Sequence, residues 1–278
     1  MECAHQAMKY DWANEQLRIA NAVICSYGCE PFRLPVEDPR FRKAMEEINP
    51  AWVYEASPAE KSSSLRLVGG VDISFAKETP LAVASLCVMT FPEMRLVHSM
   101  MRHCEMLYPY VPGFLAFREA PAILPLLDEL RTSLPHLVPD LLLVDGNGVH
   151  HPRKCGLASH LGVLANIPSI GCAKKFLSVG NLTRSDVEKM FLSSEKRVLR
   201  VVDDAACCIV ALTGNSTAKP IYISPGHLVS LEVAAALVMM VTPCRVPEPI
   251  RQADLLSRKY IREAFDHGST DCGERLTE

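Results

Sequence analysis

Two aspartates stand where strands of a sheet would carry them to an edge. Asp72 lies in the middle of the strand-like run LRLVGGVDISF, among apolar neighbours. Asp145 ends the apolar run LLLV and is followed by Gly146 and Gly148. Asp is depleted in strands, and a buried ionised carboxylate is costly unless it has partners or a metal ion. For Asp145 an ordinary Asp-Gly turn is the alternative.

The chemistry that such acids support is divalent-metal binding. Two carboxylates on adjacent strands predict an oxygen-ligand site, and Glu119 and Asp254, on expected helices, could complete it. A lone acid on a helix is more often a surface residue, so both readings stay open for these two. The ion expected is Mg²⁺, with Mn²⁺ able to substitute, because metal ions of this kind stabilise attacking and leaving oxygens in nucleases.

Positive charge gathers after the second aspartate. The stretch from Asp145 to Arg184 carries five Lys or Arg residues and one acid, although the formal net charge of the protein is −3. The net charge of the protein therefore gives no indication of a nucleic-acid partner. The excess of basic residues in this stretch, however, favours a phosphate-bearing substrate. A solvated charged face is the alternative.

The elements that must position these residues alternate between strands and helices. Runs at 65–75, 81–90 and 95–106 predict an antiparallel meander, and a strand over 140–145 is followed by a helix over 157–165 and a strand over 169–173. That unit implies parallel strands joined by a right-handed crossover. A helix over 115–134 should start late or kink at Pro121 and Pro125. We also expect strands near 197–202, 207–212 and 220–224, a loop at Pro225–His227, and helices over 183–193, 230–241 and 250–265.

Composition indicates one globular α/β domain with flanking segments. Of the 278 residues, 49% are hydrophobic and 22% are charged, which allows a sizeable core. We expect an N-terminal extension over 1–64, with a helix at about 11–24 and an irregular linker after it. The main domain should span 65–265, and a loose tail should follow over 266–278.

The cysteines indicate a reducing compartment. Eleven cysteines are scattered without CxxC spacing, and many lie in apolar runs. This favours buried thiols over a disulfide framework or a zinc site. The chain shows no charged-then-apolar leader, and the apolar run Val233–Val241 is too short to span a bilayer. We expect an intracellular protein with no membrane partner, in the cytoplasm or the nucleus, including the nucleolus.

Six segments in order resemble the endonuclease V family. They are VGGVDISF, PYVPGFLAFRE, LLLVDGNGVHHPRKCGLASHLGVL, GCAKKF, ISPGHLVSLE and RVPEPIRQADLLSR, and they cover roughly 65–262. The resemblance implies a ribonuclease H-like fold, with a mixed central sheet flanked by helices in a single catalytic domain. It also implies metal ligands at Asp72, Asp145 and Glu119, with Asp254 completing the acidic cluster. Lys174 matches an active-site lysine, and His227 matches a histidine near the site.

The same resemblance implies a base-flipping apparatus. Pro109, Tyr110, Val111 and Pro112 match the family's wedge, in which the tyrosine stacks where the base has been pulled out. Leu115, Gly146 and Gly148 match positions that line the pocket for that base. His151 and Arg153 match basic positions, which we expect to contact phosphate.

The implied activity is Mg²⁺-dependent hydrolysis of the second phosphodiester bond 3′ to inosine, leaving 3′-hydroxyl and 5′-phosphate ends. The cysteine-rich character and the VDGNG form resemble animal members. We therefore expect inosine-containing single-stranded RNA as the main substrate, deoxyinosine-containing DNA as a second, and a monomer. The alternatives are a DNA-repair enzyme acting mainly on deoxyinosine DNA, a non-catalytic inosine-binding protein, and an unrelated metal-dependent phosphatase or nuclease without base preference.

Overall fold

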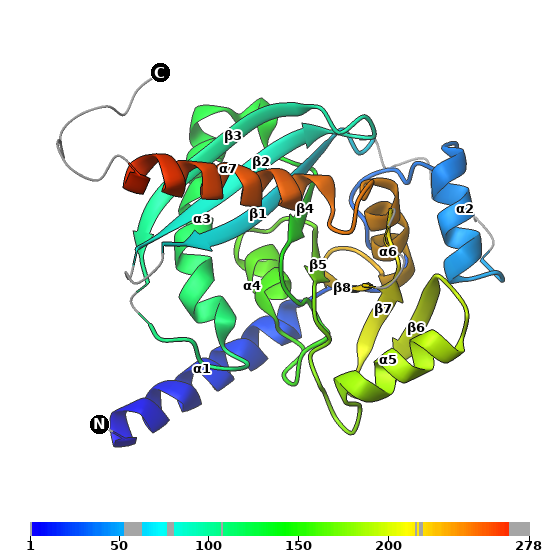
Figure 1. The fold of residues 1–278 in the computed structure, drawn as a ribbon, viewed down its shortest axis with the longest axis horizontal. Helices are drawn as coiled ribbons and strands as arrows, with labels where there is room; N and C mark the ends of the chain where they lie inside the picture. The colour runs from blue at the N-terminus through cyan, green and yellow to red at the C-terminus, as the bar shows by residue number, and fades with distance from the viewer. Residues whose placement is uncertain are drawn as a thin grey trace.

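The structure is a computed structural model that describes residues 2–52, 63–76, 81–106, 108–214, 216 and 219–266. Within these residues, eight strands form one mixed sheet in the order β3-β2-β1-β4-β5-β8-β7-β6, which confirms the predicted α/β class (Figure 1). The strands are β1 (Leu67–Phe75), β2 (Leu81–Thr90), β3 (Leu96–Glu105), β4 (Leu141–Val144), β5 (Ser169–Ala173), β6 (Val198–Val202), β7 (Cys207–Ala211) and β8 (Ile221–His227).

The centre of the sheet is parallel, as the strand–helix–strand pattern predicted. β1 pairs in parallel with β4, and β4 pairs in parallel with β5, so their carboxyl ends meet at one edge. On one side of this centre, β2 is antiparallel to both β1 and β3. On the other side, β8 is antiparallel to β5, and β7 is antiparallel to both β8 and β6. Ligands of open α/β sheets gather outside the carboxyl ends of the strands, which makes this edge the place to look for a site.

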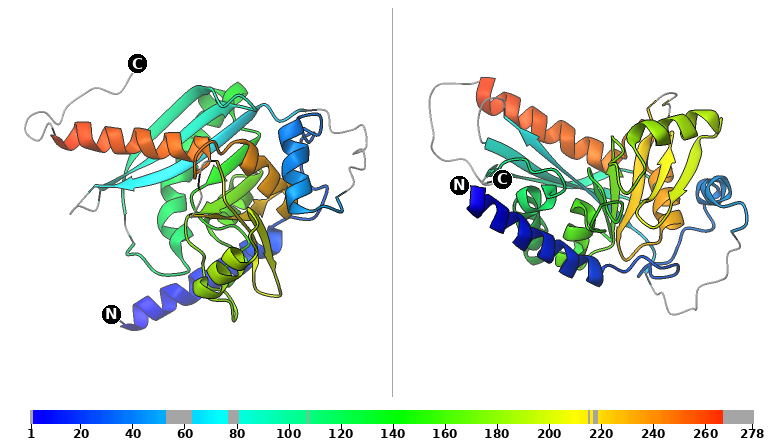
Figure 2. Two further views of the ribbon diagram at one scale, coloured as in Figure 1. Left: turned by 45° about the vertical axis from the view of Figure 1, so that its right-hand side comes forward. Right: turned by 90° about the horizontal axis from the view of Figure 1, so that it is seen from below.

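Helices cover both faces of the sheet. α3 and α4 pack on one face in one hydrophobic cluster, and α5 extends that face over β6, β7 and β8. α2, α6 and the start of α7 pack on the other face. Figure 2 shows α1 and α7 on opposite sides of the sheet. The helices are α1 (Glu2–Ala22), α2 (Pro39–Ile48), α3 (Leu115–Ser133), α4 (Leu157–Leu164), α5 (Arg184–Ser193), α6 (Leu231–Met240) and α7 (Glu248–Asp266), with a short 3₁₀ helix at Pro135–Leu137.

Close backbone packing fixes α7 on β1 and β2. A Cβ at Gly70 would lie 2.1 Å from the carbonyl carbon of Pro249, so only glycine lets the first turn of α7 come this near. Further along α7, the Ser74 and Ser257 hydroxyls are 2.7 Å apart in a buried hydrogen bond. The Ser85 hydroxyl donates to the carbonyl oxygen of Ala253 (3.0 Å). These contacts set the position of Asp254, the next residue of the helix.

The N-terminal segment shares the core of the main domain. Its predicted helix is longer than expected and spans Glu2–Ala22, and the prediction of an irregular linker was wrong over Pro39–Ile48, where α2 forms. Phe32, Phe41 and Met45 are buried in the same cluster as α6 and the sheet. Residues 53–62 of the predicted linker and residues 267–278 of the predicted tail lie outside the described residues.

Two further predictions need correction. The expected loop Pro225–His227 is the last part of β8, whose pairing with β5 continues to Ser169 through an irregularity in register. α3 spans Leu115–Ser133, close to the predicted bounds, and runs through both internal prolines, so of the two predicted outcomes, a late start or a kink, the late start did not occur. None of the described helices has the length and apolar character that crossing a membrane requires.

Candidate active site

The sheet register brings the two predicted aspartates together. Val71 of β1 pairs with Val144 of β4, so the next residues of the two segments, Asp72 and Asp145, lie side by side. Lys174 comes directly after β5, the next strand along. Its Nζ forms an ion pair and hydrogen bond with Oδ2 of Asp145. The structure therefore brings together three of the residues singled out in the sequence, one within β1 and the other two directly after the adjacent strands β4 and β5.

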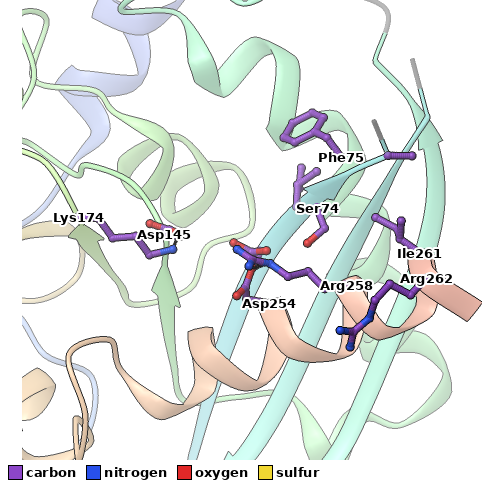
Figure 3. Close-up of a pocket in the computed structure, with 11 residues that line it drawn as sticks. Ser74, Phe75, Asp145, Lys174, Asp254, Arg258, Ile261 and Arg262 are labelled. Atoms are coloured by element: carbon purple, nitrogen blue, oxygen red, sulfur yellow. Dashed lines mark hydrogen bonds and ion pairs between the residues drawn. The ribbon is translucent and has the colours of Figure 1, made fainter. Parts of the chain in front are cut away.

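A cleft of about 790 Å³ opens over these residues (Figure 3). Asp254 enters it from α7, where Arg258 Nε donates to its Oδ1 at 2.7 Å. Figure 3 shows the Lys174–Asp145 pair and the Arg258–Asp254 pair as neighbours along the cleft. The floor is completed by the end of β1, including the half-exposed ring of Phe75, and the outer wall by Ile261 and Arg262.

The acids at this edge destabilise one another's ionised forms. Burial, followed by repulsion from Asp145 and Asp254, raises the pKa of Asp72 to about 7. Burial, followed by repulsion from Asp72 and Asp145, raises the pKa of Glu119 on α3 to about 8. Glu119 is thus near enough to both strand acids to interact with them, as predicted. Strongly perturbed acids in a cleft are a common property of functional sites.

For Lys174 the same acids favour the charged form. Burial lowers its pKa, but the carboxylates of Asp145, Asp72 and Asp254 outweigh burial and leave the pKa raised. The ammonium group is therefore positively charged at neutral pH. Together with Arg258 it offsets part of the negative charge of the acids.

The donor chemistry fits a divalent cation, although the described residues alone do not form a complete set of ligands around one. Among the residues that the structure describes, no group of three or more His, Cys, Asp or Glu side chains is arranged to hold a metal ion. The predicted ligand set Asp72, Asp145 and Glu119 is therefore not preassembled. Mg²⁺ seldom uses such a cage, and it normally binds one or two carboxylates, several waters and a substrate phosphate. Two carboxylates with excess negative charge beside a lysine meet that requirement.

The predicted wedge projects from the turn before α3. Tyr110 is 64% exposed, and Pro109 and Pro112 are exposed beside it. Val111, the fourth wedge residue, is 7% exposed and anchors the turn in the protein interior. Leu115, the first residue of α3, is half-buried. Tyr110 is the member of this turn that presents an aromatic face to solvent.

A cluster of hydrogen-bonded residues fixes the turn that carries the wedge. We call these residues, Gln16, Gly113, His151 and Arg153, the wedge support. The carbonyl oxygen of Gly113 accepts hydrogen bonds from Arg153 Nη2 (2.6 Å), His151 Nε2 (3.1 Å) and Gln16 Nε2 (3.1 Å). Arg153 Nε donates to Gln16 Oε1 (2.5 Å), and Gln16 Nε2 also donates to the carbonyl oxygen of Cys155 (2.9 Å). Gln16 is 1% exposed.

These contacts involve His151 and Arg153, the two residues predicted to contact phosphate. His151 is 4% exposed, and burial first, then the charge of Arg153, lowers its pKa to about 4, so the ring is neutral. The guanidinium of Arg153 lies 4.2 Å above the Phe114 ring and is committed to Gly113 and Gln16. Both side chains therefore help to fix the wedge turn, and their contact with phosphate stays a prediction.

Helix α1 reinforces the same turn with an aromatic cluster. The Trp12 ring stacks on Phe117 at a centroid distance of 4.9 Å and an interplanar angle of 6°. Its edge meets Tyr108 at 5.1 Å and 89°. Rings in these geometries attract one another beyond their burial of apolar surface. The N-terminal helix therefore packs against residues that precede and follow the wedge in the sequence.

The two glycines predicted to line a base pocket differ. A Cβ at Gly146 would meet the Leu157 side chain at 3.4 Å, which is a tolerable contact. A Cβ at Gly148 would lie 1.9 Å from the carbonyl oxygen of Pro225. The N–H of Gly148 donates to Ser224 Oγ (2.9 Å), and its carbonyl oxygen accepts from the N–H of Gly156 (2.9 Å). Gly148 is therefore a packing glycine whose backbone groups are already used, contrary to the prediction.

His227 does not lie near the acids, so that part of the prediction is wrong. β8 runs antiparallel to β5, and His227 pairs with Ser169 at the start of β5, while Lys174 follows its end. His227 is 6% exposed, and its Nδ1 accepts a hydrogen bond from the N–H of Ile24 (3.3 Å). It joins the segment after α1 to the sheet at the opposite edge.

Two residues of these regions, Arg258 and Gln16, were not predicted from the sequence. Arg258 lies four positions after Asp254 on a helix, a spacing that pairs opposite charges, so this ion pair could have been found. Gln16 carries no local signal, because its partners lie 97 to 139 positions away.

Comparison with known proteins places these features in a family. The family described as Endonuclease V matches residues 51–255. Human Endonuclease V is 44% identical over 209 residues, which cover 73% of this chain and 74% of the human protein. The crystal structure of human ENDOV superimposes with a TM-score of 0.74 at 36% identity, covering 91% of this chain and 98% of that one.

A second structure contains a nucleic acid. Endonuclease V of Ciona intestinalis, in complex with a 24mer DNA containing an inosine followed by a ribo-adenosine, gives a TM-score of 0.77 at 30% identity, covering 93% of this chain and 99% of that one. The similarity to these structures agrees with the ribonuclease H-like fold expected from the sequence.

Proposed function

Because the chain belongs to the endonuclease V family and is a nuclease, we propose that it hydrolyses nucleic acid at the second phosphodiester bond 3′ to inosine. The observation that carries this proposal is the cleft in which Asp72 of β1, Asp145 after β4 and Lys174 after β5 meet. The Ciona intestinalis relative, which binds inosine-containing DNA, supports the choice of base.

Asp72 and Asp145 would hold the metal ion, which we propose to be Mg²⁺, with Mn²⁺ able to replace it. When bound, the ion supplies positive charge to the attacking and leaving oxygens of the phosphate. The raised pKa of Asp72 supports this role, since a cation would remove the repulsion that now disfavours its ionised form. Asp254 would add negative charge to the cluster from α7.

The other charged groups have distinct proposed roles. Lys174 carries its charge at neutral pH and would turn from Asp145 toward the scissile phosphate or the attacking water when the cation neutralises that acid. Glu119, whose ionised form is disfavoured by burial and by the two strand aspartates, would be relieved of that repulsion by the same cation and is the candidate third ligand. We propose no catalytic part for His227, which lies at the other edge of the sheet.

Tyr110 would stack in the gap that the flipped inosine leaves. Its ring is exposed, while Val111 and the carbonyl of Gly113 are fixed from inside the protein. A stacking face that is already ordered loses little entropy on binding, and stacking on one base is worth about 1–3 kcal/mol. Leu115 and Gly146 are the remaining candidates for the lining of the base pocket.

We propose single-stranded RNA as the preferred substrate and deoxyinosine DNA as the second. Support comes from the animal-type VDGNG sequence and from the identity to the human and mouse proteins, 44% in each case. In the Ciona intestinalis complex the inosine is followed by a ribonucleotide, which is compatible with an enzyme that accepts a 2′-hydroxyl near the cut.

The test is cleavage of four matched single-stranded oligonucleotides, RNA and DNA, each with one inosine or one guanosine, in Mg²⁺ and in EDTA. We expect metal-dependent cutting of the inosine strands alone, faster on RNA, with 3′-hydroxyl and 5′-phosphate ends. Equal cutting of inosine and guanosine strands would refute base recognition. Products with 2′,3′-cyclic phosphate would refute attack by water, because they require attack by the 2′-hydroxyl.

A further inference from the structure

A second hollow of about 360 Å³ adjoins the active-site cleft at Lys174, which lines both. Its lining residues come from the end of β5, the start of β8 and helix α5. Five of its lining residues are basic and one is acidic. The lining consists of Lys174, Lys175, Arg184, Glu188, Lys219, Pro220, Tyr222 and Arg245.

The positive charge of this hollow is only partly neutralised. Glu188, its single acid, is paired with Arg184 (2.6 Å). Lys175 and Lys219 are exposed and form no ion pair with any residue that the structure describes. The hollow therefore has an excess of cations with access to solvent, on a protein whose formal net charge is negative.

Arg245 is held in a fixed position at the hollow by backbone carbonyl groups. Its Nη2 donates to the carbonyl oxygens of Lys174 (2.9 Å) and Pro220 (3.3 Å), and its Nε donates to that of Lys219 (3.1 Å). A half-buried guanidinium is thus held in place by neutral acceptors, with no carboxylate partner among the described residues. Preorganised cations of this kind suit the oxygens of a phosphate group.

The position of the hollow relative to the acids and the wedge indicates which part of a nucleic-acid strand could reach it. Along the sheet edge the order is Asp72 on β1, Asp145 after β4, Lys174 after β5, and then the hollow beside β8. Glu119 lies on α3, which packs against β2 and β3 on the far side of β1 from β4, and the wedge is the turn before that helix. A strand whose flipped base lies near the wedge, and whose scissile phosphate lies at the acids, would continue past Lys174 into the hollow.

We propose that this hollow binds the backbone phosphates that follow the scissile bond on its 3′ side, with Lys175 and Lys219 as the contacting cations. The inference rests on the proposed function, since it assumes a cut 3′ to a base held near the wedge. It adds a binding site for the downstream strand, recognised through charge and without regard to base.

The experiment compares K175A/K219A with K189A/K196A, which removes two exposed lysines from α5 and the segment after it without touching the hollow. Binding of inosine-containing single-stranded RNA is measured by fluorescence anisotropy in EDTA at several salt concentrations. One RNA ends shortly after the scissile bond, and the other continues for several nucleotides. Each phosphate contact on a single strand contributes about 0.7 to the slope of log K against log salt.

For the long RNA we expect K175A/K219A to lower that slope by about 1.4 relative to the wild type, and K189A/K196A to leave it unchanged. For the short RNA the difference between K175A/K219A and the wild type should disappear. Equal slopes for the two variants, or an equal loss on short and long RNA, would overturn the proposal. Failure of the proposed function would look different, because wild-type protein would then bind inosine and guanosine strands equally whatever the salt slope.

Discussion

The acid cluster (Asp72, Glu119, Asp145 and Asp254) and the wedge support differ in how their polar groups are satisfied. In the wedge support, three donors converge on one carbonyl oxygen, that of Gly113, and the groups involved are neutral or paired with protein atoms. In the acid cluster, like charges face one another, and two cations offset them only in part. The first region is complete without a ligand, and the second requires one.

This difference assigns the two regions different tasks. A satisfied buried network holds a single geometry, so the wedge support fixes where Tyr110 stands before any substrate arrives. An unsatisfied cluster binds whatever relieves its repulsion, so the acid cluster is where a cation and a phosphate would meet. The sequence marked both regions as functional, but only the contacts distinguish the region that binds from the region that positions.

The largest expected effect breaks the acid cluster. Asp72→Asn removes one of the two proposed metal-holding carboxylates, and loss of several kcal/mol of transition-state stabilisation should slow cleavage about a thousandfold or more. Because the substitution also relieves repulsion, the melting temperature in EDTA at pH 8 should stay equal or rise. Single-turnover cleavage and thermal melting measure the two quantities.

Asp140→Asn is the matched control, because Asp140 lies just before β4 and accepts hydrogen bonds from the N–H groups of Arg66 (2.8 Å) and Leu67 (3.0 Å). It should melt earlier and still cleave. If Asp72→Asn melted earlier and kept its activity, the assignment of Asp72 as a ligand would be wrong.

The next effect concerns the wedge itself. Tyr110→Ala should weaken binding of the inosine strand by about 1–3 kcal/mol, the stacking energy of one base, without changing the melting temperature. The side chain is 64% exposed, which is why stability should not respond. Tyr10→Ala, at an equally exposed tyrosine of α1, is the control. Unchanged affinity for Tyr110→Ala would show that the ring does not contact the substrate.

A smaller effect should follow from breaking the wedge support. Gln16→Leu leaves the carbonyl of Cys155 and Nε of Arg153 without their partner, which should cost about 1–3 kcal/mol of unfolding free energy. It should also reduce the preference for inosine over guanosine, since the wedge turn loses its fixed position. Gln6→Leu, on the exposed side of the same helix, should change neither quantity. A loss of stability with full inosine preference would mean that Gln16 is structural only.

The smallest effect is a pH dependence that separates the regions. Asp72 has a raised pKa, so the folded state holds its proton more tightly than the unfolded state, and the stability this gives is lost as pH rises from about 4 through 7. The difference in melting temperature between Asp72→Asn and wild type in EDTA should therefore grow from pH 5 to pH 8. His151, with its pKa lowered to about 4, acts in the opposite sense, because its stability is lost as pH falls below about 6.5. A difference that is constant with pH would contradict the raised pKa of Asp72.

Much of the fold could be predicted because its signals are local. β2 was predicted at its observed bounds from a continuous apolar run between turn signals, and β5 likewise. α2 was missed although Asp38 before Pro39 is a standard start of a helix, and the Asp38 side chain does accept from the N–H of Arg40. The start of α2 is therefore encoded in its local sequence.

The site was predictable only where strand order is implied by sequence. Asp72, Asp145 and Lys174 each end or occupy a strand of the parallel centre, so their meeting follows from topology. His227 was misplaced because nothing local reveals that β8 runs antiparallel to β5. The true partners of His151 and Arg153 come from a helix more than a hundred residues earlier and from the turn before α3, which no local pattern encodes.

The central claim is that the acid cluster is completed by a divalent cation. The most direct measurement is the melting temperature of wild type and Asp72→Asn at pH 8 as Mg²⁺ is titrated, because a ligand that binds only the folded state raises stability by mass action. We expect the melting temperature to rise for the wild type and to rise little or not at all for Asp72→Asn. Equal rises in both proteins, or none in either, would contradict it.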